Sequence, residues 1–315
     1  KEAKNMQISL ILMEEIAKLF LIMFMGYALV KTKLLRVQDS KVVSVILVYL
    51  VIPCMIVHAF QIDDSPQVRT GLLFAFAAAA AVHVLFLLFT AILRKPCRLS
   101  TIEQLTVIYT NAGILVVPLI QALLGQQYVV YSCGFLVVQL VLIWTHCRSK
   151  LTADNGIQWK KILWNINVIS IFIGAVLFLC HITLPSVIDD TIQMTGDMVG
   201  PMGMLLAGMV IADIPLKQVF TAWGNYKTVL LRLLVYPLLL LVLFRVMHVT
   251  GMVADGKNIL LTVFLACITP ACATVTSMAQ LYDKDAAKSS VLYVLTTICS
   301  IVTMPIMIGL YCAWL

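Results

Sequence analysis

Two apolar stretches of the sequence combine helix breakers with uncharged polar side chains that could hold a solute. Residues 110–121 read TNAGILVVPLIQ, and residues 269–280 read TPACATVTSMAQ. Amide and hydroxyl groups both donate and accept hydrogen bonds, so either can bind a polar ligand. The candidate substrate-binding residues are Asn111, Gly113, Pro118, Thr269, Pro270, Thr274, Ser277 and Gln280.

A break in either stretch has a chemical consequence, because it exposes backbone groups at the ends of two half-helices. N-terminal ends carry partial positive charge that favours anions, and C-terminal ends favour cations. Two breaks that cross would therefore hold a carboxylate without a formal cation. For Ser277 and Gln280 taken singly, hydrogen bonding within or between helices is the favoured interpretation.

Several ionisable side chains also fall inside apolar stretches. Lys18 follows Glu14 by four residues, a spacing that favours an ion pair on a helix. Arg232 and Arg245 lie toward the two ends of one stretch, and we expect each to extend its charged end to the membrane surface. Asp197 is followed closely by a Gly-Pro pair and is the candidate for proton or cation coupling, because ionisable groups in spans are functional candidates.

The composition predicts an all-α integral membrane protein. Of the 315 residues, 62% are hydrophobic and only 12% are charged, with a mean hydropathy of +1.01. A membrane span needs about 20 apolar residues, and it must be a helix because lipid offers backbone groups no partners. We predict ten spans joined by short connections, near residues 8–30, 42–60, 70–93, 102–124, 129–147, 167–184, 193–212, 228–249, 258–281 and 289–312.

The distribution of charge predicts how these spans are oriented. Most of the 22 Lys and Arg residues fall in alternate connections, which places those connections in the cytoplasm. Both termini of this multi-pass cell-membrane protein are then non-cytoplasmic. The N-terminal KEAKNMQ leads directly into the first span, so we expect no cleavable secretory signal.

The prolines indicate an internal repeat. Pro53 and Pro118 are 65 residues apart, and Pro201 and Pro270 are 69 apart. We predict a single membrane domain built from two five-helix repeats, residues 1–150 and 151–315, with the second inverted relative to the first. Interrupted spans at matching places of two inverted halves are typical of the binding site of a carrier.

Other classes of function find no support in the sequence. The nine Cys include no CxxC pair and the five His are dispersed, so we expect neither a metal site nor a disulfide framework. The sequence shows no phosphate-binding loop, so we expect no cofactor and no direct use of ATP. No catalytic cluster converges in the spans, and an enzyme is not expected. The net charge of +7 lies in short loops, so nucleic-acid binding is not expected either.

Several segments resemble the auxin efflux carrier family, which is related to the plant PIN carriers and to the bile-acid sodium symporter superfamily. The segments are, in order, FMGYALVKTKLL, LVYLVIPCMIVHAF, NAGILVVPL, GPMGMLLAGMVIA and TPACATVTSMAQLYDKD. The resemblance implies ten helices in two inverted five-helix repeats, with broken helices 4 and 9 crossing beside an organic anion. It gives Asn111 the family's amide position. Val116 and Thr274 depart from the pattern, because the family has Gly at the first position and often Asn at the second.

We therefore expect a secondary carrier that moves a small organic anion, such as a carboxylate, across the membrane by alternating access. A proton and a sodium ion are the candidate coupling ions. The alternative is a membrane-embedded sensor that binds a lipid, a sterol or a metabolite in the same pocket without transport. Membrane lipid is an expected partner, and homodimerisation is left open.

Overall fold

The computed structural model describes residues 2–152, 159–221 and 223–315, and helices dominate this part of the chain. Shorter apolar helices cover Ala112–Leu123, Ile166–Leu179 and Gly256–Ile268. The prediction of an all-helical protein with several membrane spans is confirmed. The helices that are long and apolar enough to cross a membrane are Val37–Ala59, Pro66–Leu93, Gln126–Thr152, Ser186–Ile211, Trp223–Val246 and Ala286–Trp314.

The first half of the chain contains long helices with capped ends. The Ser65 hydroxyl accepts from the backbone N–H of Val68, which fixes the start of α4, and Ser100 and Glu103 form a capping box at the start of α5. Its helices are α1 (Glu2–Lys31), α2 (Ser40–Ile46), η2 (Leu47–Val51), α3 (Ile52–Ala59), α4 (Pro66–Leu93), α5 (Thr101–Ile108), α6 (Ala112–Leu123), α7 (Val129–Leu142), η4 (Ile143–Cys147) and α8 (Arg148–Thr152). The segments η2 and η4 are π-helical turns that continue their neighbours without a break.

The second half contains another interrupted helix. The helix α16 ends at Ile268, and the backbone of the next residue, Thr269, is extended (ψ 158°), because a residue that precedes proline is driven out of the helical region. The helices of this half are α9 (Trp159–Leu163), α10 (Ile166–Leu179), α11 (Ser186–Gly196), α12 (Val199–Ile211), α13 (Leu216–Thr221), α14 (Tyr226–Leu230), η6 (Leu231–Val235), α15 (Tyr236–Val246), α16 (Gly256–Ile268), α17 (Ala273–Leu281) and α18 (Ala286–Trp314).

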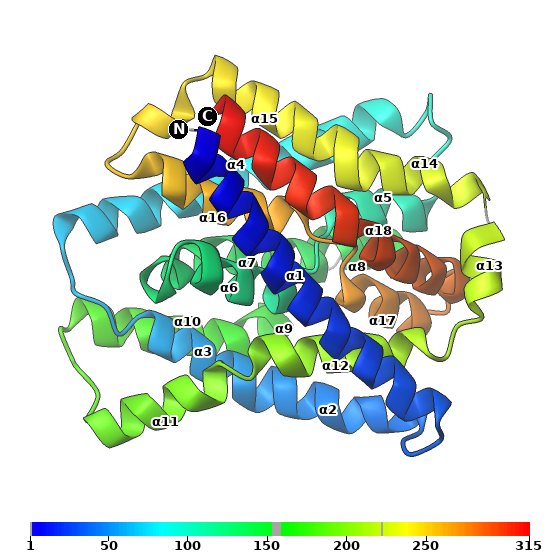
Figure 1. Cartoon of the computed structure of the whole chain (residues 1–315), viewed down its shortest axis with the longest axis horizontal. Coiled ribbons are helices and arrows are strands. Elements are labelled where there is room, and N and C mark those ends of the chain that lie inside the picture. The colour runs from blue at the N-terminus through cyan, green and yellow to red at the C-terminus, as the bar shows by residue number, and fades with distance from the viewer. Residues whose placement is uncertain (1, 153–158, 222) are drawn as a thin grey trace.

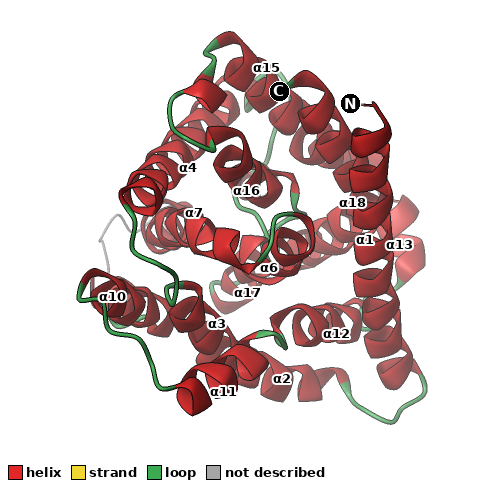
Figure 2. Ribbon diagram, turned by 60° about the vertical axis from the view of Figure 1, so that its left-hand side comes forward, coloured by secondary structure: helices red, strands yellow, loops and turns green. Residues whose placement is uncertain are grey.

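The helices pack in two groups around the interrupted ones. In one group α1 lies along α12, while α3 packs against α10 and α11; in the other, α4, α7 and α16 pack together and α18 packs against α17. Figure 2 shows α6, α16 and α17 near the middle of the molecule, with the other helices around them. The two chain ends lie next to each other at the same end of the molecule (Figure 1).

The sequence predicted a helix interruption at Pro118 and another at Pro270, and only the second is observed. Pro270 lies between α16 and α17, as expected. The expected break at Pro118 is wrong, because α6 is continuous through this residue and the interruption lies before Asn111, the N-cap of α6. A proline inside a helix removes one hydrogen bond, and neighbouring groups in a membrane protein can satisfy the carbonyl that it frees.

The contact between α1 and α12 depends on glycine. A Cβ atom on Gly208 would lie 1.9 Å from the carbonyl oxygen of Met23, and a Cβ on Gly26 would lie 2.2 Å from that of Leu205. Small residues of this kind let helix backbones approach closely in a membrane, where packing rather than the hydrophobic effect holds helices together.

We predict that Gly208→Ala lowers the free energy of unfolding by about 1–3 kcal/mol, because the added methyl forces α1 and α12 apart. Gly251→Ala is the matched control, since a Cβ there meets nothing within 4 Å. Thermal unfolding in detergent measures both variants. Equal midpoints for the two variants would show that the close approach of α1 and α12 does not stabilise the fold.

Candidate functional site

The two interruptions lie against each other and pair through their backbones. The backbone N–H of Asn111 donates to the carbonyl of Pro270 (2.9 Å), and that of Cys272 donates to the carbonyl of Tyr109 (3.2 Å). These bonds form an isolated antiparallel bridge between Thr110 and Ala271. We call residues 109–111 and 269–272 the crossing. Because the bridge is antiparallel, the two backbone segments run through it in opposite directions.

Side chains from neighbouring helices satisfy further backbone groups of the crossing. The Gln139 side chain, on α7, accepts from the N–H of Thr110 (2.9 Å) and donates to its carbonyl (3.0 Å). The Thr296 hydroxyl, on α18, accepts from the N–H of Ala271 (3.1 Å). A buried backbone group without a partner is costly in a membrane, so these two residues stabilise both interruptions.

A buried arginine contacts the crossing from the other side. Arg232, in η6, has no exposed surface, and its Nη2 donates to the carbonyl of Thr269 (2.7 Å). The Nη1 atom lies 3.5 Å from the carbonyl oxygen of Val107, near the end of α5. The expectation that Arg232 reaches the membrane surface is therefore wrong. The carbonyls at the ends of α5 and α16 come together only in the folded chain, and they offer its charge a partner in the interior.

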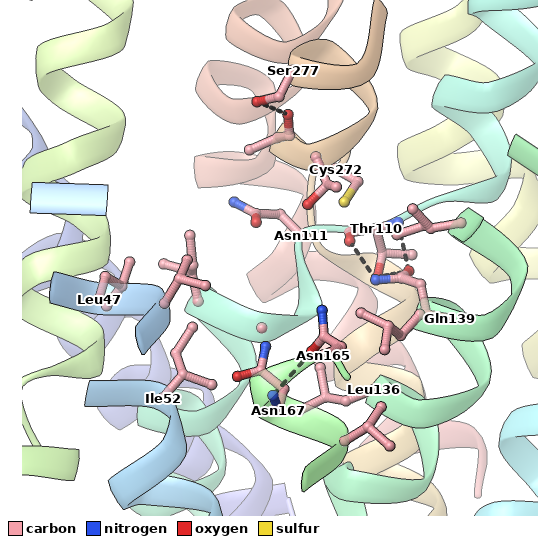
Figure 3. A pocket seen from close by; sticks show the side chains of 18 of the residues that line it. Leu47, Ile52, Thr110, Asn111, Leu136, Gln139, Asn165, Asn167, Cys272 and Ser277 are labelled. Atoms are coloured by element: carbon pink, nitrogen blue, oxygen red, sulfur yellow. Dashed lines mark hydrogen bonds between the residues drawn. The ribbon is translucent and has the colours of Figure 1, made fainter. Parts of the chain in front are cut away.

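A cavity of about 370 Å³ lies beside the crossing, on the side where α6 and α17 begin (Figure 3). Its walls come from α2 and η2, α7, η4, α10 and α12 as well as from the two crossing chains. Most of the lining is apolar, including Leu47, Ile52 and Leu136. No Asp, Glu, Lys, Arg or His side chain lines the cavity in the described part of the chain, so its polarity comes mainly from amides, hydroxyls and helix ends.

Four predicted site residues line this cavity: Asn111, Gly113, Thr274 and Ser277. In Figure 3 the Asn111 side chain extends from the crossing into the cavity. Within the described chain the Asn111 side chain makes no hydrogen bond, so its amide is free to bind a ligand. Thr274 and Ser277 share one exposed face of α17, as their spacing indicated.

The other predicted residues lie around the cavity or elsewhere. Thr269 and Pro270 form part of the crossing, and Gln280 lines a second, adjoining cavity of about 780 Å³. Pro118 lies farther along α6 and packs against Gly200, where a Cβ would come within 3.1 Å of the proline ring.

Sequence reasoning missed two asparagines at the start of α10. Asn165 and Asn167 both line the cavity, and the Asn165 side chain caps α10 by accepting from the N–H of Asn167 (2.9 Å). The Oδ1 atom of Asn167 is buried and has no hydrogen-bond partner among the described residues. The local signal was the sequence WNIN before an apolar run, which predicts a helix cap but not a position facing a cavity.

The second cavity adjoins the first and extends toward one end of the molecule. The two cavities share lining residues, among them Ile114 and Ser277, so they adjoin. The second one continues to Lys41 and Asp213, which are exposed near the ends of α2 and α12.

Contacts between α6 and the region of α12 border the second cavity and continue to the opposite end of the molecule. Gly203 and Ile114 both line the second cavity, and a Cβ on the glycine would lie 2.0 Å from the isoleucine side chain. Farther along, the Gln121 amide donates to Asp197 (3.1 Å). Asp197, the candidate coupling residue, is exposed at this opposite end and does not line the cavity beside the crossing.

This arrangement defines a class of protein: a multi-pass membrane protein with a solute-sized cavity where two interrupted helices meet, as in many transporters. The comparison with protein families agrees. A family model described as Membrane transport protein matches residues 11–156 and again residues 152–308. The chain belongs to this family, the auxin efflux carrier family of PIN-like membrane transport proteins, so the resemblance stated above is confirmed. Comparison with curated proteins gives no match.

We predict that Gln139→Leu destabilises the protein although it keeps the side-chain volume. It leaves the N–H and carbonyl of Thr110 without this partner, at a cost of about 1–3 kcal/mol for each buried group. Thermal unfolding in detergent, with the exposed Gln38→Leu as the control, measures the effect. If both variants unfold at the wild-type temperature, the Gln139 hydrogen bonds do not stabilise the crossing.

Proposed function

We propose that the chain is a secondary carrier that moves a small organic anion across the membrane by alternating access. One observation carries the proposal: the free Asn111 amide lies in the cavity where the N-terminal ends of α6 and α17 begin. An N-terminal helix end has the effect of about half a positive charge, and its unpaired N–H groups bind anions.

The lining of the cavity favours one kind of anion. The described lining has no cation that would bind a multiply charged solute, and it has a large apolar part. A monocarboxylate with an apolar body fits both features: the carboxylate lies at Asn111 and the helix ends, and the body lies against residues such as Leu136 and Ile52. Asn165 and Asn167 offer further hydrogen bonds on the opposite wall.

We assign the remaining site residues roles that follow from where they lie. Thr274 and Ser277 contact the anion from the exposed face of α17. Gly113 keeps the start of α6 open, since the nearest atom to a Cβ there is 3.9 Å away. Thr269 and Pro270 hold the interruption in shape, and Gln280 lines the entry.

The carrier would have ten spans in two inverted halves, residues 1–150 and 151–315. Three observations support this arrangement. The two backbone segments of the crossing are antiparallel, and the N- and C-terminal ends lie at one end of the molecule. The two family matches overlap only at residues 152–156. The positive-inside rule places the open end of the cavity, with Lys41, in the cytoplasm and both chain ends outside.

We infer alternating access from the difference between the two ends of the molecule. The second cavity extends from beside the first toward Lys41, and the hydrogen bond between Gln121 and Asp197 joins the two groups of helices at the other end. Moving the group that holds the crossing against the group of α1, α3, α10, α11 and α12 would break the Gln121–Asp197 contact and close the second cavity. Asp197 is then a gate residue.

We predict that Asn111→Ala reduces transport by about tenfold or more, since a hydrogen bond to a charged group contributes about 1.5–3 kcal/mol. The measurement is uptake of radiolabelled benzoate, phenylacetate and indole-3-acetate into proteoliposomes. Asn258→Ala is the control, because Asn258 bonds Asp255 and Tyr128 and does not line the cavity.

Two results would contradict the proposed function. Wild-type flux from a correctly folded Asn111→Ala protein would contradict the role of the amide. Saturable binding of a carboxylate to the wild-type protein without any flux would contradict a carrier and favour a sensor.

A further inference from the structure

In the described part of the chain, no ion pair balances the positive charge of Arg232. It is completely buried in η6, and no carboxylate pairs with it in the described part of the chain. Glu103, in α5, accepts a hydrogen bond from the hydroxyl of Thr228, which lies one turn before Arg232. Glu103 is already paired with Lys227 (3.3 Å) and Lys288 (3.4 Å), so it leaves the charge of Arg232 uncompensated.

The guanidinium lies where the crossing itself attracts a cation. It donates to the carbonyl of Thr269, the C-cap residue of α16, and lies near that of Val107 at the end of α5. Both are C-terminal helix ends, which carry partial negative charge. In carriers with interrupted helices, such ends and the freed carbonyls are the groups that coordinate a coupling sodium ion or proton.

Other groups around Arg232 also favour a positive charge at this position. The ring of Phe86 lies 5.8 Å from the guanidinium carbon, within the range of a cation–π contact. The Nε atom has no partner, so the side chain is held by its two terminal nitrogens and by the ring. The π-helical turn that carries Arg232 lies within an otherwise continuous helix, and such turns are frequent at functional sites.

We propose that Arg232 is a resident cation that takes the place of a coupling sodium ion at the crossing, so that transport by this chain does not require sodium. The part of this proposal that concerns flux rests on the proposed function above. The part that concerns cation binding does not. A bound monocarboxylate at Asn111 would then balance the charge of Arg232 across the crossing, and the loaded crossing would be close to neutral.

The first test measures stability and needs no substrate. Purified wild-type protein should unfold at the same temperature in sodium chloride and in choline chloride of equal concentration. Arg232→Ala leaves the two carbonyls without a donor, and we expect its midpoint to fall by about 5 °C or more. Millimolar sodium or guanidinium chloride should restore part of this loss, because either cation can occupy the vacated place.

Two further variants make the result specific. Arg232→Lys keeps the charge and should remain insensitive to sodium. Arg245→Gln removes the other arginine of the same span, which is exposed and donates to the carbonyl of Trp314, and it should gain no response to sodium. If Arg232→Ala does not fold, the wild-type and Arg232→Lys measurements still decide the question.

The second test measures benzoate uptake into proteoliposomes with sodium or choline on both sides. We expect equal rates for the wild-type protein. Sodium-dependent unfolding or uptake of the wild-type protein would overturn the proposal, as would an Arg232→Ala protein as stable as wild type. Absence of uptake of any anion would count against the proposed function alone, because the stability test would still decide whether Arg232 replaces a cation.

Discussion

The structure depends on how the backbone groups of two interrupted helices are satisfied inside a membrane. Lipid offers such groups no hydrogen bonds, so each interruption must find partners within the protein. Here the interruptions pair with each other through the bridge between Thr110 and Ala271, and Gln139 and Thr296 satisfy further groups on either side. The crossing is therefore a fixed part of the fold, and both helix groups must be arranged around it.

This solution divides the charge of the crossing between two faces. The C-terminal ends of α5 and α16 face Arg232, while the N-terminal ends of α6 and α17 face the cavity. One face thus holds a permanent cation, and the other presents helix ends that favour an anion. An anion site can therefore exist in an apolar cavity without a charged side chain in its lining. The same division explains why Arg232 is tolerated in the interior.

The sequence predicted the class of fold, the family and half of the crossing, and it failed where distant segments decide the result. Apolar composition alone required membrane helices, and proline after Thr269 correctly placed one interruption. Pro118 was misleading, because a single lost hydrogen bond does not end a helix, and the break before Asn111 depends on the bridge to α16 and α17. Arg232 and Asn167 were misjudged or missed, since their surroundings come from helices far away in the sequence.

The central claim is that an organic anion binds where α6 and α17 begin. The most direct measurement is an experimental structure of the protein with bound 4-iodobenzoate, whose iodine marks the orientation of the ring. The account predicts that the carboxylate lies within hydrogen-bond distance of the Asn111 amide and the first N–H groups of these helices, with the ring against Leu136 and Ile52. A ligand bound only at the lipid-facing surface, or a chain whose helices run unbroken past residues 109–111 and 269–272, would contradict it.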